Sequence, residues 1–257
     1  MSTKIIAFVD GSIYSASVCE HAAWAAKRLG VPVDLLHVLG RREAVEQPDL
    51  SGSIKLGART ALMAELAALD EQRAKLVAHR GRAILDDAQA LLTAAGVTEV
   101  TTHLRHGDLI ETLGEREAEA ELILIGKRGE AADFAIGHLG SNLERIVRAA
   151  HRPILVAARA FNPIKKVLIA YDGGTSAMKA VDYIARSPLF ADLEISVVAV
   201  GTKNPATEKG LADAASLLRA AGIVAQTAIT PGQPETALGK LVEEAGYDMV
   251  VMGAYGH

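Results

Sequence analysis

Cysteine, aromatic residues and long apolar runs are all scarce in this sequence of 257 residues. The single cysteine, Cys19, excludes a disulfide framework within the chain and a zinc site built on cysteines. No apolar run reaches the roughly 18–20 residues of a membrane-spanning helix, and no signal-peptide pattern follows Met1. Neither charge dominates, because 27 basic residues face 31 acidic ones. We therefore expect a cytoplasmic, soluble protein with no nucleic-acid or membrane partner.

The residues that are abundant favour an α/β fold. Apolar residues make up 50% of the chain and charged residues 23%, which is typical of a well-packed globular protein. Aromatic residues contribute only 4%, so alanine, valine, isoleucine and leucine must form most of the core. This mixture suits parallel strands that are buried between alanine-rich helices.

The same order of strands and helices occurs twice along the chain. In each copy an apolar run leads to an aspartate, Asp10 or Asp172, and then to a helical stretch. The spacing from Asp10 to Val38 equals the spacing from Asp172 to Val200. The corresponding expected segments are 5–9 and 167–171, 14–29 and 175–186, 33–38 and 195–200, 100–104 and 223–229, and 121–125 and 248–252. The chain is therefore predicted to be an internal duplication.

Short strands that alternate with helices predict right-handed parallel crossovers, and hence two tandem doubly wound α/β sheets. The first domain is predicted over residues 1–160 and the second over 164–257. The boundary falls at Pro163, which disfavours regular structure before it. Compared with copy one, copy two is expected to be incomplete at its carboxyl-terminal end: either the chain is truncated relative to a longer product, or copy two has no last helix and strand.

Copy one contains a long insertion, 41–95, that copy two does not have. A polar loop is expected over 41–56, and a helical pattern follows over 58–95. Gly81 lies inside that pattern, so the sequence allows either two helices or one kinked helix. The charges of the insertion are predicted to form a solvated helix face rather than a patch that binds a partner.

Ligands of doubly wound sheets bind at the carboxyl ends of the strands, so the residues at these ends are the candidate site. In copy one they are Asp10-Gly11-Ser12 after the first strand, Val38 in the second, Gly107 after the third, and Gly126-Lys127-Arg128-Gly129 after the fourth. A helix that starts at Ser141 would offer free amide groups to a phosphate. The alternative role of Ser141 is a plain helix N-cap.

Together these residues resemble a known family. Asp10, the LLHV segment of the second strand, and the stretch from GKRG to GHLGSNLERIVRAAHRPILV are similar to the universal stress proteins, in particular to their tandem E-type members. The resemblance covers both copies from Lys4 onward and implies five-stranded sheets of order 3-2-1-4-5. It also implies a stress-response protein that binds ATP or another small ligand in its first domain.

The resemblance further implies a role for each candidate residue. Asp10 and Val38 would flank the ribose and adenine of ATP, and the family pattern Gly-x2-Gly-x9-Gly-Ser/Thr would wrap the phosphates. The residues assigned to that loop are Gly126, Gly129, Gly140, Ser141 and Asn142. Lys127 and Arg128 would either add charge to the phosphate oxygens or serve as solvated turn residues. Ten residues, rather than nine, separate Gly129 from Gly140. The loop therefore either absorbs a bulge or does not bind phosphate.

Copy two keeps half of this site. Asp172 and Val200 match Asp10 and Val38, but only His257 follows Gly253-Ala-Tyr-Gly256. In tandem members the fifth strands of the two copies pack as a pseudo-dimer within the chain. Without that partner, the segment Pro153–Val156 would form an exposed edge or pair with another molecule, which would permit a homodimer.

No arrangement typical of a dedicated enzyme is present. The chain has no Gly-x-Ser-x-Gly elbow, no Walker lysine motif and no Gly-x-Gly-x-x-Gly turn. His103 and His106 are interpreted as a strand residue and a turn residue, and Cys19 as a buried structural thiol. Asp10 could hold Mg²⁺ against the phosphates of ATP, and no other metal site is predicted.

Three functional hypotheses follow from these observations. The first is a nucleotide-binding stress module, with ATP in copy one and copy two as its partner domain. The second is a non-nucleotide stress scaffold that acts through protein partners or an apolar ligand, with the insertion 41–95 as its distinguishing feature. The third is a weak phosphoryl-transfer enzyme, which we do not favour.

Overall fold

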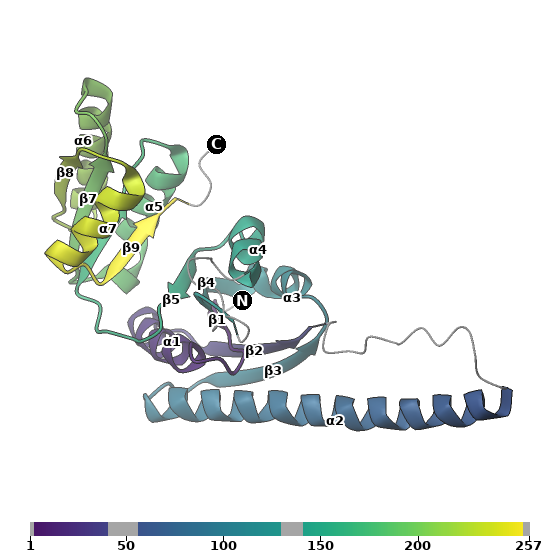
Figure 1. The fold of residues 1–257 in the computed structure, drawn as a ribbon. Helices are drawn as coiled ribbons and strands as arrows, with labels where there is room; N and C mark the ends of the chain where they lie inside the picture. The colour runs from purple at the N-terminus through teal and green to yellow at the C-terminus, as the bar shows by residue number, and fades with distance from the viewer. Residues whose placement is uncertain (1–2, 41–55, 130–140, 254–257) are drawn as a thin grey trace. The chain divides into compact units, whose positions relative to one another are not determined.

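The computed structural model describes residues 3–40, 56–129 and 141–253, and the chain divides into two compact units, Met1–Phe161 and Asn162–His257 (Figure 1). Each unit is a parallel β-sheet flanked by helices, as the sequence predicts. The predicted doubly wound α/β fold is therefore confirmed.

Unit 1 contains a five-stranded parallel sheet of order β3-β2-β1-β4-β5. Its strands are β1 (Lys4–Phe8), β2 (Val33–Leu39), β3 (Val100–His106), β4 (Ala120–Gly126) and β5 (Ile154–Ala157). Its helices are α1 (Ser15–Leu29), α2 (Leu56–Ala94), α3 (Leu109–Arg116) and α4 (Ser141–Ala149), with a 3-10 turn, η1 (Glu117–Glu119), after α3. Helices α1 and α2 cover one face of the sheet, and α3 and α4 cover the other (Figure 1).

Continuous apolar runs form the central strands because both faces of the sheet are covered. Four of the five residues of β1 are buried, and α1 lays a row of buried alanines on the sheet. On the other face, Ile6 and Phe8 of β1 pack with Leu113 of α3 and Ile146 of α4. Aliphatic side chains thus form the core on both faces, as the low aromatic content predicts.

Helix α2 is one continuous helix, so Gly81 does not divide it into two helices. The reason for this glycine is instead a close contact with the sheet. Gly81 is buried where the carboxyl-terminal half of α2 packs on β2 and β3. A Cβ at this position would lie 2.6 Å from Leu104 Cδ1 and 3.0 Å from His37 Cδ2. The glycine therefore permits a close approach of the helix to the sheet. The predicted polar loop before α2 lies outside the described residues, apart from Leu56.

Unit 2 repeats the first four strands of unit 1. Its sheet has the order β8-β7-β6-β9, and these are all the strands that occur in the described part of the unit. The strands are β6 (Lys166–Ala170), β7 (Glu194–Val200), β8 (Gln226–Thr230) and β9 (Met249–Met252). The helices are α5 (Thr175–Arg186), α6 (Pro205–Ala220) and α7 (Pro234–Ala245), with a 3-10 turn, η3 (Pro188–Phe190), after α5.

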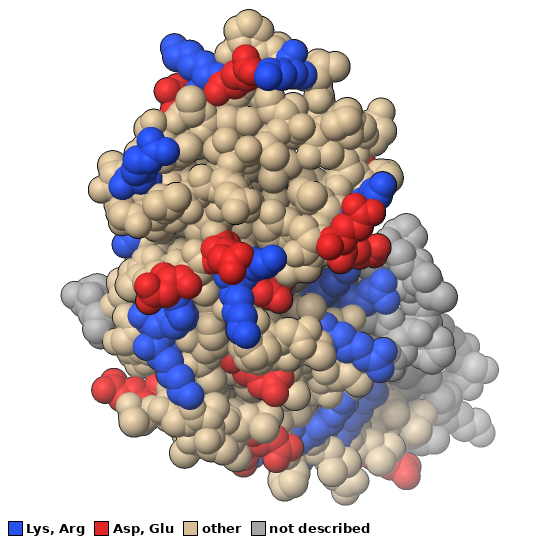
Figure 2. All heavy atoms as spheres, turned by 90° about the vertical axis from the view of Figure 1, so that its left-hand side faces the viewer, with Lys and Arg blue, Asp and Glu red and all other residues tan. Residues whose placement is uncertain are grey.

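Charges of both signs lie on the face of the molecule that Figure 2 shows. Figure 2 shows Lys and Arg side chains together with Asp and Glu side chains, with wide uncharged areas between them. Among the helices of the described residues, none has the length and apolarity required to cross a bilayer.

Candidate functional site

The candidate site lies where the strand order of unit 1 reverses. The chain runs from β1 outward to β3 and then returns to add β4 and β5 on the other side of β1. The carboxyl ends of β1 and β4 are therefore adjacent, and this is the position at which doubly wound sheets bind ligands. Asp10 follows β1, and the Gly126–Gly129 turn begins at the end of β4.

Asp10 is held in a fixed turn between β1 and α1. Its Oδ1 accepts a hydrogen bond from the Ser12 amide at 3.0 Å and one from the Ser15 hydroxyl at 3.3 Å. The Ser15 hydroxyl oxygen in turn accepts from the amides of Asp10 and Gly11. The side chain of Asp10 is half-buried in this arrangement. Sequence analysis gave Ser15 no role in this turn, although its spacing from Asp10 was visible.

Two glycines of the β4 turn lie directly against the β1–α1 region. A Cβ on Gly129 would be 2.9 Å from Asp10 Oδ2, and a Cβ on Gly126 would be 2.8 Å from Tyr14 Cβ. Ordinary side chains do not fit at such distances, so the backbone itself approaches Asp10 here. The structure thus brings Asp10, Gly126 and Gly129 together, as expected from the strand ends.

Lys127 and Arg128, between these glycines, differ in their surroundings. The Lys127 amide donates a hydrogen bond to the Ala157 carbonyl at 3.0 Å, which extends the β4–β5 pairing, and its side chain is exposed. Arg128 is half-buried, and its Nε is a buried donor with no hydrogen-bond partner among the described residues. The amide of Lys127 is therefore already used, and its exposed side chain fits a solvated turn residue. Arg128, for which the same two roles were open, is half-buried and presents a buried donor.

Val38 and Gly107 lie on the other side of Asp10, along β2 and β3. Val38 is half-buried and packs against the core under α3 and α4. The Gly107 amide donates to the Leu39 carbonyl at 3.1 Å, so it continues the β2–β3 ladder. Val38 therefore offers an apolar surface at the strand ends, whereas Gly107 acts in strand pairing at the edge of the sheet.

Helix α4 supplies the remaining predicted residues. It begins at Ser141, and Asn142 in its first turn is exposed, whereas Gly140 lies outside the described residues. The neighbouring helix, α3, is capped by Asp108, whose side chain accepts from the Ile110 and Glu111 amides. Arg145 of α4 forms an ion pair with Asp108 at 2.6 Å, and this contact holds the pKa of Asp108 below its usual value.

The half-site of unit 2 is more open than the corresponding turn of unit 1. Asp172 is exposed, and its Oδ1 accepts from the Gly174 amide at 2.8 Å. Val200, at the end of β7, is half-buried like Val38. Gly256, which would correspond to Gly129, lies outside the described residues.

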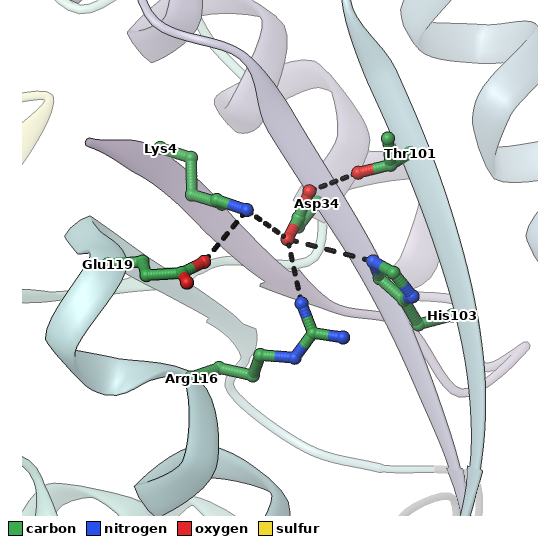
Figure 3. A network of polar contacts seen from close by, with 6 residues as sticks. All are labelled: Lys4, Asp34, Thr101, His103, Arg116 and Glu119. Carbon is green, nitrogen blue, oxygen red and sulfur yellow. Dashed lines mark hydrogen bonds and ion pairs between the residues drawn. The ribbon is translucent and has the colours of Figure 1, made fainter. Parts of the chain in front are cut away.

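A buried polar network that the sequence analysis missed lies at the opposite, amino-terminal end of the strands of unit 1 (Figure 3). Asp34 of β2 is its centre, with a side chain only 4% exposed. Asp34 Oδ2 lies 3.1 Å from Lys4 Nζ, 3.6 Å from Arg116 Nη1 and 3.7 Å from His103 Nε2. Thr101 of β3 donates its hydroxyl to Asp34 Oδ1. Several cations and donors thus compensate one buried carboxylate.

The same network shifts the titration of its members. The hydrogen bond from Lys4 to Glu119 raises the pKa of Lys4, and Asp34 adds to this effect. Burial lowers the pKa of His103, and the nearby Arg116 lowers it further. The signal in the sequence was an aspartate inside the apolar VDLLHV segment, and the network follows from the strand register, which pairs Asp34 with Thr101. It lies away from the candidate ligand site and connects β1, β2 and β3 with Arg116 at the end of α3.

Metal-binding and nucleophilic groups were also sought. Within residues 3–40, 56–129 and 141–253, no three His, Cys, Asp or Glu side chains cluster in a way that could hold a metal ion. Cys19 is buried, and burial raises the pKa of its thiol to about 12. His103 lies within β3 and His106 is its last residue, so both are strand residues. The interpretation of Cys19 as a buried thiol is confirmed.

Comparison with known proteins gives concordant matches. Residues 1–158 match the sequence profile of the Universal stress protein family. The chain is 37% identical to the universal stress protein Slr1230 of Synechocystis sp. (strain ATCC 27184 / PCC 6803 / Kazusa), over 99% of this chain and 90% of that protein.

The comparison with solved structures found further universal stress proteins. The crystal structure of a universal stress protein from Archaeoglobus fulgidus DSM 4304 has a TM-score of 0.71 at 19% identity, covering 98% of this chain and 87% of that chain. The structure of a universal stress protein from Archaeoglobus fulgidus in complex with dAMP has a TM-score of 0.37 at 21% identity, covering 60% of this chain and 97% of that chain.

Proposed function

This chain belongs to the universal stress protein family as a tandem member, and from that premise we propose that its first unit binds an adenine nucleotide. The observation that carries the proposal is the juxtaposition of Asp10 and Gly129, where a Cβ would lie only 2.9 Å from Asp10 Oδ2. A carboxylate and a bare backbone loop thus meet at the reversal of the strand order, where doubly wound sheets bind nucleotides.

Each group at this position has a chemistry that suits part of a nucleotide. The Asp10 carboxylate is suited to accept hydrogen bonds from ribose hydroxyls, because its Oδ1 is fixed by the Ser12 amide and the Ser15 hydroxyl. Val38 offers an apolar contact for the base. The loop from Gly126 to Gly140 and the first turn of α4, with Ser141 and Asn142, would surround the phosphates.

Positive charge for the phosphates would come from the β4 turn. Lys127 is exposed beside the site, and the Nε of Arg128 is a buried donor without a hydrogen-bond partner in the described part of the chain. Mg²⁺, where present, would be held mainly by phosphate oxygens with Asp10 as a protein ligand, because the described residues contain no larger cluster of metal-binding groups.

We propose binding rather than catalysis as the activity of this site. The Ser15 hydroxyl donates to the Asp10 carboxylate, and its oxygen accepts from the amides of Asp10 and Gly11. These two amide donors occupy the oxygen lone pairs that a nucleophile would use. In this proposal the protein is a cytoplasmic stress-response module whose occupancy by nucleotide changes its interactions with protein partners.

The first experiment identifies what the purified protein carries. The freshly purified full chain is denatured, the polypeptide is removed, and released small molecules are identified by mass spectrometry. We expect an adenine nucleotide, and titration calorimetry with ATP, AMP and Mg-ATP then gives the affinity and stoichiometry. One site per chain is expected, because Asp172 is exposed and, among the described residues, no glycine after β9 meets its carboxylate as Gly129 meets Asp10.

Matched substitutions in the two units locate the site. Asp10→Asn keeps an acceptor for Ser12 and Ser15 but removes the charge, and Gly129→Val fills the approach to Asp10, so both should weaken nucleotide binding at least tenfold. Asp172→Asn is the same change in unit 2 and should leave the affinity unchanged. Full affinity in Asp10→Asn and Gly129→Val, or no binding of any adenine nucleotide by the parent chain, would refute the proposal.

A second candidate function is a scaffold or apolar-ligand protein that does not use nucleotides. The observation that favours it is the commitment of the Lys127 and Gly107 amides to neighbouring strands, which leaves fewer donors for phosphate. Release of an apolar molecule, or of nothing together with no heat of nucleotide binding, would favour this second function.

A further inference from the structure

Helix α2 has two halves with different surroundings. In the carboxyl-terminal half, Gly81, Leu85, Ala88 and Leu92 are buried against the rest of unit 1. In the stretch 62–80, by contrast, none of the side chains is buried. Figure 1 shows this amino-terminal half of α2 continuing beyond the edge of the sheet on which the other half packs.

This amino-terminal half carries an apolar stripe. Leu62, Leu69 and Leu76 recur every seven residues, and Leu66 lies between the first two on the same side of the helix. Leu69 and Leu76 are 55% and 71% exposed. The described residues bury no side chain of the stretch 62–80, and a helix exposed in this way is only marginally stable in water. An apolar stripe on such a helix favours a packing partner.

Charges along the same stretch change sign near its middle. Glu65, Asp70 and Glu71 precede Arg73 and Lys75. Glu71 pairs with Lys75 on the same helix, whereas Asp70 and Arg73 form no ion pair within the described residues. Along this stretch, acidic residues therefore precede basic ones. A second helix of the same sequence places its basic end beside the acidic end of the first only when it runs in the opposite direction.

We propose that residues 62–80 of α2 pair, as an antiparallel two-helix coiled coil, with the same residues of a second copy of this chain. The contact is isologous, with its two-fold axis close to Glu71 and Gln72. The paired stretch is about 28 Å long at 1.5 Å per residue. This surface differs from the exposed sheet edge at β5.

Antiparallel pairing about this axis satisfies both the apolar stripe and the charges. Leu66 lies opposite Leu76 of the second copy, and the aliphatic stem of Arg73 covers Leu69 of the second copy. The guanidinium of Arg73 then reaches Asp70 of the second copy. A parallel, in-register pair would instead place Arg73 directly against its own counterpart, so like charges would face each other across the core.

The test measures the oligomeric state of the full chain by sedimentation equilibrium over a range of protein concentrations. We expect a reversible dimer for the parent. The variant Leu69→Glu/Leu76→Glu should raise the dimer dissociation constant by roughly a hundredfold or more, as for the loss of two central apolar anchors. The control Leu91→Glu changes a leucine that is 45% exposed on the packed half of the same helix, and should leave the dimer intact.

Charge reversal and cross-linking test the direction of the helices. Asp70→Arg and Arg73→Asp should each weaken the dimer, and the double variant should restore it. In a Cys19→Val background, Gln72→Cys should cross-link to itself through a short bismaleimide, whereas Glu65→Cys should not, because only Gln72 lies near the two-fold axis.

Three results would overturn the proposal. They are a parent chain that stays monomeric at all concentrations, a dimer that survives Leu69→Glu/Leu76→Glu, and efficient self-cross-linking at Glu65→Cys, which indicates parallel helices. Circular dichroism checks that each variant keeps its helix content. Nucleotide binding is measured separately, so failure here leaves the proposed function untouched.

Discussion

The two units of this chain share a strand order but differ at the residue that would bind a ligand. Asp10 is half-buried and held by Ser12 and Ser15, and the loop after β4 approaches its carboxylate. Asp172 occupies the same position in unit 2, yet it is exposed and accepts one backbone hydrogen bond, from Gly174. The comparison shows that the aspartate at the first strand end is compatible with two different environments.

The glycine at the end of the fourth strand, by contrast, meets the same constraint in both units. A Cβ would lie 2.8 Å from Tyr14 Cβ at Gly126, and 2.6 Å from Ser176 Cβ at Gly253. This glycine therefore serves the packing of the fourth strand's end against the start of the helix after the first strand, α1 or α5, whether or not a complete ligand loop follows. Its presence alone is weak evidence for nucleotide binding, and Gly129 beside Asp10 is the more informative residue.

The largest effect is predicted for one buried position near the start of the second strand of each unit, β2 or β7. It holds Asp34 in unit 1 and Ser196 in unit 2, each beside the corresponding residue of the first strand. Asp34→Ser therefore gives unit 1 the residue of unit 2. We expect unit 1 to lose about 3 kcal/mol of unfolding free energy, because Lys4 and Arg116 keep their charges without the carboxylate.

Trp24 is the single tryptophan of the chain and lies in α1, so its fluorescence during urea denaturation reports on unit 1. Ser196→Ala is the matched control in unit 2, whose unfolding is followed by hydrogen exchange with mass spectrometry. Ser196→Ala should lower the unfolding free energy of unit 2 by about 1 kcal/mol or less. A loss in Asp34→Ser no larger than in Ser196→Ala would show that the polar network does not stabilise unit 1.

The second prediction compares the glycines of α2 and α6. A Cβ on Gly81 would meet the flexible end of Leu104 at 2.6 Å, whereas a Cβ on Gly210 would meet the Tyr171 hydroxyl oxygen at 2.5 Å. Tyr171 is a buried, rigid ring that cannot rotate aside as a leucine methyl can. Gly210→Ala should therefore destabilise unit 2 by about 1–3 kcal/mol.

Gly81→Ala should cost less, because Leu104 can adjust and alanine gains about 1 kcal/mol of helix propensity over glycine. The measurement is again urea denaturation, followed by Trp24 fluorescence for unit 1 and by hydrogen exchange for unit 2. A greater loss in Gly81→Ala than in Gly210→Ala would reverse the expected order and show that α2 packs more rigidly on the sheet.

The third prediction is a pH dependence confined to unit 1. Burial lowers the pKa of both His21 and His103 in the folded chain. The unfolded state therefore binds protons at a higher pH than the folded state. The stability that depends on these neutral histidines is fully present above about pH 6.5 and is lost progressively as the pH falls below that value. The described part of unit 2 contains no histidine.

Urea denaturation between pH 7 and pH 5, followed by Trp24 fluorescence, measures this loss. His103→Gln should reduce the slope of stability against pH in unit 1, and hydrogen exchange in unit 2 should change less over the same range. An unchanged slope in His103→Gln would assign the effect to other groups.

Much of the fold follows from the sequence alone because its signals are local or repeated. The buried runs of β1 and β6, the helices after them and the equal spacing of Asp10 and Asp172 predict two copies of a parallel sheet. The strand order is what the resemblance to the universal stress proteins implies. The role of Gly81 could not be predicted, since its reason lies in Leu104 and His37 on two other elements. A glycine in a helical pattern indicates a break as readily as a close approach.

The candidate site could be predicted only as a set of strand ends. Which amides remain for a ligand depends on where the hydrogen-bond ladder stops, and Lys127 and Gly107 both continue that ladder. The network around Asp34 likewise depends on the register of three strands and on Arg116 after them. These are relations between distant segments, which a single sequence does not specify.

The smallest effect is expected where the two units are most alike, in the helix that follows the first strand. Cys19 in α1 and Val181 in α5 occupy corresponding positions, and both are buried. Cys19→Val therefore replaces the residue of unit 1 with that of unit 2, and unfolding of unit 1 should change by less than about 1 kcal/mol. Because burial raises the pKa of the Cys19 thiol to about 12, the native parent chain should also resist a thiol reagent at pH 8 until it unfolds. Rapid labelling of the native chain, or a large loss of stability in Cys19→Val, would mean that the helices after the first strands are not packed alike. The difference between the units would then extend from the ligand site into the core.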